Sequence, residues 1–181
     1  IANHAAQLGA EVIYITGPTH YKTDHSRIKT IPVVSAQEMY TQVHLYFNSV
    51  DVAILSAAVA DYKPINQATS KIKKASPTLS LELEKTKDIL ASLGTIKSHQ
   101  LLVGFALETN DEIANAIKKL KSKNLDLIVL NSLNDEGAGF GGTTNKITLI
   151  DKNLVQTKFP LKSKADVAID IMNQLLKQFN A

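Results

Sequence analysis

The sequence contains no cysteine. This excludes a thiol nucleophile, a disulfide framework and thiolate metal sites together, and it is typical of a cytosolic protein. No Gly-x-Ser-x-Gly motif indicates a serine hydrolase, and the histidines show no metal-ligand spacing. There are five of them: His4, His20, His25, His44 and His99.

Long apolar runs and a strong charge of one sign are also absent. No segment reaches the 18 or so apolar residues of a membrane span, and no basic segment precedes an apolar one at the N-terminus as in a signal peptide. Lys plus Arg outnumber Asp plus Glu by only 20 to 17, too few for the basic face that binds duplex DNA. We therefore predict one cytoplasmic domain over residues 1–181, with neither membrane nor nucleic-acid partners.

Short apolar runs alternate with helical patterns along the chain. The runs at 51–57, 101–106 and 125–130 are almost purely apolar, as in parallel strands covered on both faces, and Val12–Thr16 is a fourth strand. This alternation predicts an α/β fold with a doubly wound, mostly parallel sheet.

Four helices are expected between and around these strands. The first ends at Gly9; the second starts at Ser35, whose spacing to Glu38 is that of a capping box. The third lies between 110 and 124, with Ile113, Ile117 and Leu120 on one face. The C-terminal helix follows an antiparallel hairpin that turns at 151–153, and its predicted inward residues are Ala168, Ile171, Met172, Leu175 and Phe179.

Small and polar residues follow the predicted strands. Open α/β sheets bind ligands beyond the carboxyl ends of their strands. Ser56, Ala57 and Ala58 end one strand, and small side chains there allow a ligand close to the backbone, although tight packing of a helix on the sheet would require them equally. Asp61 follows them, either as a ligand group or as an ordinary loop residue.

Lysines cluster at two places. Lys71, Lys73 and Lys74 follow a polar loop that suits a mobile flap, but a solvated charge run has the same composition. Lys119 and Lys123 are four residues apart, so on a helix they share a face and can grip a phosphate chain; lysines also favour a last helical turn for dipole reasons. The glycine-rich stretch 137–145 leads into a strand and is interpreted as the approach to the hairpin, not as a P-loop.

Seven motifs, in order and spanning nearly the whole chain, closely resemble the phosphopantothenoylcysteine synthetase (phosphopantothenate cysteine ligase) family. They are SAAVADYKP, KIKK, TKDIL, VGFALET, KLKSKNLDLIVLN, GFGGTTNKITLI and PLKSKADVA. The family fold, a modified Rossmann-like dinucleotide-binding sheet, agrees with the pattern above.

The resemblance implies a two-step reaction in coenzyme A biosynthesis. The carboxylate of 4'-phosphopantothenate attacks the α-phosphate of CTP, giving an acyl cytidylate and pyrophosphate, and the amine of cysteine then displaces CMP. Bacterial members use CTP with Mg²⁺, whose ligands the sequence leaves unknown. Many are fused to an N-terminal decarboxylase, and FMN is implied only where that domain is present.

The resemblance also implies roles for particular residues. The segment 56–58 would approach the nucleotide through its backbone and Asp61 would contact it. Lys71 would be the catalytic residue, reaching the reacting phosphate from the flap. Asp88, Ile89 and Phe105 would border the nucleotide pocket, and Lys119 and Lys123 would hold the phosphate tail.

Some family features differ or lie outside the sequence. Lys87 stands where the family usually has Pro, and Thr143 or Thr144 where it usually has Asp. The family's opening strand, its glycine-rich turn and an Asn for the cysteine step would precede Ile1, so we expect this stretch alone not to complete catalysis. A homodimer is also implied, with the hairpin 147–159 as a candidate interface.

Two other functional classes remain open from the residues. A nicotinamide-dependent reductase on the same fold would also have its glycine fingerprint before Ile1, although no Tyr is followed four residues later by Lys. A nucleotide-binding regulatory module without catalysis is the other alternative, and lysines on two separate elements favour phosphate chemistry over it.

Overall fold

A five-stranded sheet forms the centre of the protein. The computed structural model describes residues 1–66, 68–73, 78–132 and 142–179. The strand order is β10-β9-β7-β6-β3. Three strands are parallel, β3 (Val52–Leu55), β6 (Leu101–Glu108) and β7 (Leu127–Ser132), and β9 (Ile147–Asp151) and β10 (Gln156–Lys158) complete the sheet as an antiparallel hairpin. The predicted fold class, hairpin included, is confirmed.

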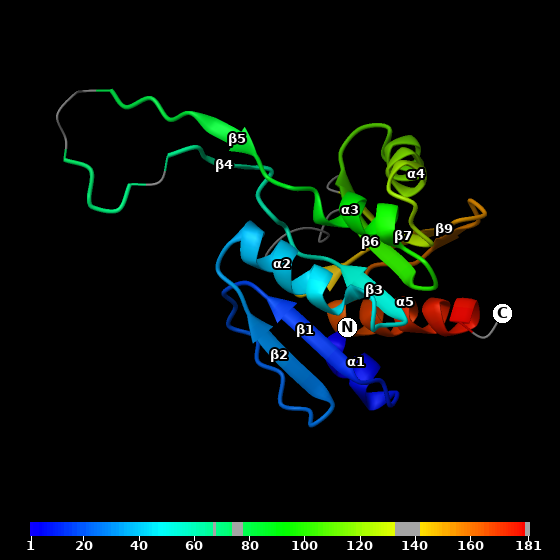
Figure 1. Cartoon of the computed structure of the whole chain (residues 1–181). Helices are drawn as coiled ribbons and strands as arrows, with labels where there is room; N and C mark the ends of the chain where they lie inside the picture. Colours follow the sequence, from blue (N-terminus) through cyan, green and yellow to red (C-terminus); the bar gives the residue numbers. More distant parts are fainter. Residues whose placement is uncertain (67, 74–77, 133–141, 180–181) are drawn as a thin grey trace.

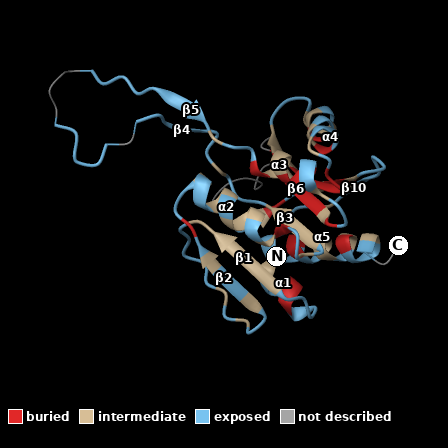
Figure 2. Ribbon diagram, in the orientation of Figure 1, coloured by how far each residue is buried: buried red, intermediate tan, exposed pale blue. Residues whose placement is uncertain are grey.

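Helices cover both faces of this sheet (Figure 1). One face packs on α2 (Ala36–Phe47), α3 (Ile89–Ile96) and α4 (Glu112–Ser122), and the other on α5 (Lys164–Phe179). Along β7 the side chains alternate, with Ile128 and Leu130 in the first core and Leu127 and Val129 in the second. Burial on both faces explains the purely apolar runs (Figure 2).

The predicted N-terminus of α2 is correct, with one difference from the capping box. Ser35 Oγ accepts a hydrogen bond from the Glu38 N–H at 3.1 Å, but Glu38 Oε2 accepts from the N–H of Val34, not from that of Ser35. Both bonds satisfy amide groups where the chain enters the helix, so the start of α2 is fixed on both sides.

The predicted inward position of Phe179 is wrong. Leu175 is the last buried residue of α5, and Phe179, one turn further, is 58% exposed. The helix continues beyond the sheet at its C-terminal end, where the core offers no surface to cover the ring (Figure 1). The other expected inward residues are correct: Ala168, Ile171 and Leu175 are buried, and Met172 packs against the same core.

A separate two-stranded sheet lies beside the central one. It contains β1 (Val12–Thr16) and β2 (Ile28–Pro32), which are parallel, and it follows α1 (Ala2–Gln7). Within the described residues β1 pairs only with β2, and β3 only with β6.

Gly94 sits where α3 meets the loop after α4. A Cβ built on Gly94 would lie 2.0 Å from the backbone oxygen of Lys123, which no side-chain rotation relieves. We expect Gly94→Ala to lower the free energy of unfolding by about 1–3 kcal/mol, as an overpacked site does. Urea unfolding measures this. Gly17→Ala, whose Cβ would meet nothing within 4 Å, is the control, and equal effects of the two changes would contradict the packing argument.

Candidate functional site

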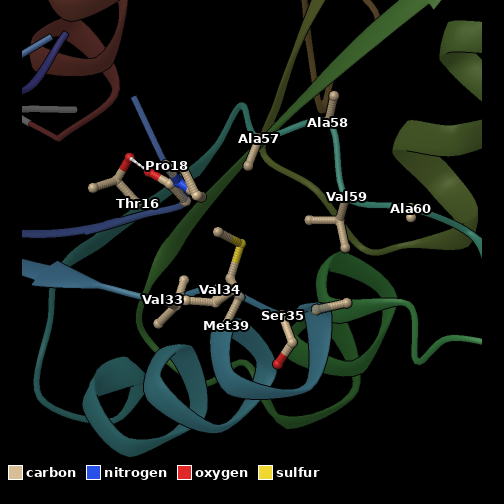
Figure 3. A pocket seen from close by; sticks show the side chains of 12 residues that line it. Thr16, Pro18, Val33, Val34, Ser35, Met39, Ala57, Ala58, Val59 and Ala60 are labelled. Carbon is tan, nitrogen blue, oxygen red and sulfur yellow. Dashed lines mark hydrogen bonds between the residues drawn. The ribbon is translucent and has the colours of Figure 1, made fainter. Parts of the chain in front are cut away.

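A first cavity of about 400 Å³ lies at the carboxyl ends of β1 and β3. Its walls are the turn Thr16–Pro18, the segment Val33–Ala36, Met39 and the loop Ala57–Ala60. In Figure 3 the Met39 side chain projects from α2 into the space between Pro18 and Ala57. The sequence placed a site at these strand ends, and the structure gives it walls of small and apolar side chains.

A second cavity of about 460 Å³ lies between β6, β7 and α5. It contains the predicted residues Ser56, Ala57, Ala58 and Phe105. Further lining residues are Ile1, Leu55, Ala106, Leu107, Asn131, Asn145, Lys164, Val167, Ala168 and Ile171. The walls are mostly apolar with a few polar groups, which is the usual make-up of a small-molecule site.

Asn131 is a polar group in the second cavity to which sequence reasoning gave no role. Its side-chain oxygen is buried and has no hydrogen-bond partner among the described residues. A buried acceptor without a partner is costly, so a ligand donor in this cavity would be favoured. The available signal was a polar residue ending an otherwise apolar strand.

Ala57 and Ala58 belong to both cavities. They follow β3 directly and their side chains are exposed. The wall between the two cavities therefore consists here of the backbone and the methyl groups of these two alanines. The strand predicted over 51–57 therefore ends earlier, at Leu55, and the small residues leave the sheet to form a wall.

The predicted lysine pair does not converge on one place. Lys119 pairs with Glu108 at the end of β6, and Lys123 Nζ lies 2.8 Å from Asp88 Oδ2. Lys123 is the C-cap of α4, and its N–H donates to the Lys119 carbonyl at 3.0 Å, so the helical spacing of the two lysines is kept while their amino groups pair with different carboxylates. Each lysine is held by its own carboxylate.

Asp88 begins α3. Its Oδ1 accepts a hydrogen bond from the Ala91 N–H at 2.9 Å, so it caps the helix as well as pairing with Lys123. Burial by itself raises the pKa of the Asp88 carboxyl, but Lys123 and the N–H groups of Ala91 and Leu90 together outweigh burial, and the net pKa is lowered. Asp88 thus carries a negative charge at neutral pH.

The lowered pKa of Asp88 predicts a pH-dependent stability difference. A carboxyl with a lower pKa in the folded state stabilises the fold above its unfolded pKa, and loses that contribution as pH falls through the folded pKa. Asn also caps helices well, so Asp88→Asn removes the charge and keeps the cap. We expect the unfolding free energies of wild type and Asp88→Asn to converge as pH falls from about 5 through the lowered folded pKa of Asp88, which lies below 3.8. A pH-independent gap in urea unfolding would contradict this.

The remaining predicted residues lie outside both cavities. Ile89 is buried in the core beneath α3, and Asp61 is exposed where an arm leaves the body. Lys71 lies on that arm, which projects from the body beyond β4 (Tyr62–Pro64) and β5 (Leu83–Lys85), as Figure 1 shows. Lys73 is beside it and exposed. Lys74 lies outside the described residues.

Among the residues that the structure describes, no three His, Asp or Glu side chains gather as metal ligands. Within the same residues no helix has the length and apolar character needed to span a bilayer.

Comparison with known proteins gives the family. Residues 1–179 match the profile of the DFP family, the DNA/pantothenate metabolism flavoprotein C-terminal domain. The chain belongs to this family. The resemblance predicted from the seven motifs is thereby confirmed.

Two curated relatives of this DFP domain show how much of a longer protein it represents. A cysteine/cysteine sulfinic acid decarboxylase from an unknown prokaryotic organism is 51% identical over 97% of the chain and 49% of its own length. The coenzyme A biosynthesis bifunctional protein CoaBC of Bacillus subtilis (strain 168) is 43% identical over 97% of the chain and 43% of its own length. The chain therefore spans less than half of either relative.

A solved structure agrees with the fold. The crystal structure of the C-terminal domain of CoaBC matches the DFP domain with a TM-score of 0.82 and 37% identity, over 99% of the chain and 80% of the solved chain.

Two departures from the usual family sequence are now placed. Lys87 Nζ lies 4.5 Å from the centre of the Tyr40 ring, and burial followed by the charge of Lys87 lowers the pKa of His44. Thr144 is in β8 (Thr144–Asn145), which pairs with β11 (Lys162–Ser163). The glycine-rich stretch before Gly142 lies outside the described residues.

Proposed function

We propose that this DFP domain is the synthetase part of a coenzyme A biosynthesis protein. The reaction is the CTP-dependent ligation of 4'-phosphopantothenate to cysteine through an acyl cytidylate. The observation that carries the proposal is the pair of cavities that share Ala57 and Ala58. Two substrates bound on either side of so thin a wall have their reacting groups close together, which is the main requirement of such a transfer.

The second cavity is assigned to the nucleotide. Phe105 offers a ring face to a base, and segment 56–58 offers backbone groups. Asn131 Oδ1 has no hydrogen-bond partner among the described residues, and the N4 amino group of cytosine is a donor of the matching kind. The first cavity then takes the acid substrate, with its carboxylate directed at the shared wall.

The chemistry requires cations around the phosphates. As the carboxylate oxygen bonds to the α-phosphorus, pyrophosphate leaves with its charge, and the cysteine amine later attacks the acyl carbon as CMP leaves. Lys71 is the proposed catalytic cation at the reacting phosphate. Lys119 and Lys123 would exchange Glu108 and Asp88 for the phosphate tail.

Mg²⁺ is proposed to enter with the nucleotide. The described residues build no three-ligand site for it. Mg²⁺ is commonly bound through substrate phosphates and retained waters with few protein ligands. No step above depends on a residue coordinating the ion.

The names of the relatives fit this division of labour. The bifunctional protein CoaBC carries two activities, and one relative is named a decarboxylase, but the chain matches under half of each. We assign ligation to the matched part, and decarboxylation with its FMN to the rest of such proteins. The same proposal includes a cytoplasmic location and a homodimer.

The deciding experiment uses the full-length protein that contains this domain. Given CTP, Mg²⁺ and 4'-phosphopantothenate without cysteine, it should release pyrophosphate, and adding cysteine should yield CMP and the amide. ATP is tried in parallel. No pyrophosphate with either nucleotide would refute the proposal.

Lys71→Gln is expected to slow acyl cytidylate formation by about 100-fold or more, as the loss of a cation at a developing charge does. The melting temperature should hardly change because Lys71 is exposed and forms no ion pair with another described residue. Single-turnover pyrophosphate release measures the first and calorimetry the second. Lys73→Gln, its exposed neighbour, is the control. Equal rates for the two variants would count against the assigned role.

A nucleotide-binding module without catalysis is the second candidate. The ion pairs of Lys119 and Lys123 favour it, because both lysines already have partners without any phosphate. It predicts that CTP binds, seen by calorimetry, while no pyrophosphate forms. A reductase would instead bind NADPH in the same crevice and leave CTP unbound.

A further inference from the structure

Glu108 is a mostly buried carboxylate at the carboxyl edge of the sheet. It is the last residue of β6, and its side chain is 14% exposed. Its Oε1 atom accepts a hydrogen bond from the ammonium group of Lys119 on α4. The Lys119 side chain is 44% exposed. The cation of this pair is therefore accessible to a ligand, whereas the carboxylate is largely enclosed.

The pair adjoins the second cavity at the end of β6. Phe105 and Leu107 line that cavity, and Phe105 packs with the core on the α5 side of the sheet. Side chains alternate along a strand, so Glu108 points to the other face, where α4 packs. Glu108 directly follows Leu107. A ligand that fills the cavity and extends past the end of the strand therefore meets Lys119.

The second lysine of the predicted phosphate site has a similar arrangement. Lys123 Nζ lies 2.8 Å from Asp88 Oδ2 at the start of α3. Side chains on a helix lean toward its N-terminus, and α4 begins at the carboxyl edge of the sheet because it follows β6. Lys119 and Lys123 thus lean toward one edge, and each is paired there with a carboxylate of the chain itself.

A phosphate tail and these carboxylates would compete for the same cations. A phosphate that takes Lys119 leaves Glu108 mostly out of water, without its counter-charge and close to the incoming anion. Both effects oppose binding, since a carboxylate removed from water needs a partner and like charges repel. When the phosphate leaves, the carboxylate recovers its lysine. The pair therefore weakens the bound state and favours release of an anionic product.

We propose that Glu108 sets the rate of pyrophosphate release by returning to Lys119 as the phosphates leave. The identity of the product rests on the proposed function, whereas the competition needs only a polyphosphate ligand. Glu108 acts through Lys119 and is a positioning residue. Asp88 contributes less, because its side chain is 50% exposed and keeps the hydrogen bond from the Ala91 N–H when Lys123 departs.

The first test is calorimetric titration of the full-length protein with inorganic pyrophosphate and Mg²⁺. Glu108→Gln keeps a neutral acceptor of the same shape, and it should lower the Kd about tenfold or more, as the loss of a charged competitor does. Asp111→Asn is the matched control, because it removes the same charge at the exposed N-cap of α4, whose side chain makes no cap hydrogen bond. Equal Kd values for the two variants, or no binding to either, overturn the proposal.

The second test determines whether the effect of Glu108 acts through Lys119. In a Lys119→Met background there is no lysine to release, so Glu108→Gln should change the Kd for pyrophosphate no more than Asp111→Asn does. If Lys119→Met does not fold, Lys119→Gln, which still donates to Glu108, takes its place. An undiminished effect in either background indicates general repulsion and overturns the action through the lysine.

The third test follows one turnover with CTP and 4'-phosphopantothenate. Rapid quenching measures the acyl cytidylate, and a coupled assay measures free pyrophosphate. Glu108→Gln should form the intermediate at the wild-type rate and release pyrophosphate about tenfold more slowly, because affinity changes act mostly on dissociation. Chemistry slowed as much as release overturns the proposal.

The titration and the turnover experiment together separate this inference from the proposed function. If the wild type forms no acyl cytidylate but Glu108→Gln still binds pyrophosphate more tightly than wild type, the proposed function fails and the competition stands. If the wild type forms the intermediate and Glu108→Gln binds pyrophosphate with the wild-type Kd, the competition fails and the proposed function stands.

Discussion

Ala57→Phe is expected to reduce acyl cytidylate formation at least 100-fold. Ala57 lines both cavities, so a phenyl ring there takes space from both proposed substrates and separates their reacting groups. Displacements of about 1 Å at a reacting centre can cost 100-fold in rate. Pyrophosphate release and calorimetric titration with CTP would measure both effects.

Stability is expected to stay near that of wild type, because Ala57 is exposed and in a loop after β3. Ala114→Phe is the matched control: the same change at an exposed alanine, on α4 and away from both cavities. It should leave activity unchanged. An active Ala57→Phe protein, or one with a strongly lowered melting temperature, would remove Ala57 from the proposed role.

The largest loss of stability is expected from Asp126→Ala. Asp126 is 8% exposed, and its Oδ2 accepts hydrogen bonds from Lys97 Nζ at 2.9 Å and from the Leu102 N–H at 2.8 Å. Truncation leaves the Lys97 ammonium without its counter-charge, with only the Asn124 carbonyl as acceptor at 2.7 Å, and it leaves the Leu102 N–H without its carboxylate acceptor. Removing one partner of such a pair costs roughly 3–5 kcal/mol, to be measured by urea unfolding.

An exposed ion pair provides the comparison. Glu11 pairs with Arg27 at the surface, and both side chains are largely exposed. Glu11→Gln should therefore cost no more than about 1 kcal/mol. If Asp126→Ala and Glu11→Gln had similar effects on the free energy of unfolding, the proposed stabilising contact of Asp126 with β6 would be refuted.

Local patterns were sufficient for much of the fold. Burial on both faces requires unbroken apolar runs, so the central strands were recognisable one by one, and the start of α2 was recognisable from Ser35 and Glu38. The small residues that follow these strands predicted that a binding site lies at the carboxyl ends of the strands. These features depend on neighbours in sequence.

Contacts between distant elements could not be predicted in this way. Lys119 and Lys123 have the spacing of a phosphate grip, but the partners that hold them, Glu108 and Asp88, belong to other elements. Asn131 was visible only as the end of a strand, and the lack of a partner for its oxygen among the described residues depends on the cavity that α5 closes.

The wall between the two cavities has a consequence for the timing of the reaction. In the proposed reaction the mixed anhydride forms beside Ala57 and Ala58 and stays there, so its lifetime would depend on how fast cysteine reaches that wall. Hydrolysis of the anhydride then competes only with that entry. Under the proposed function, the concentration of free cysteine would then determine the fraction of nucleotide consumed without product.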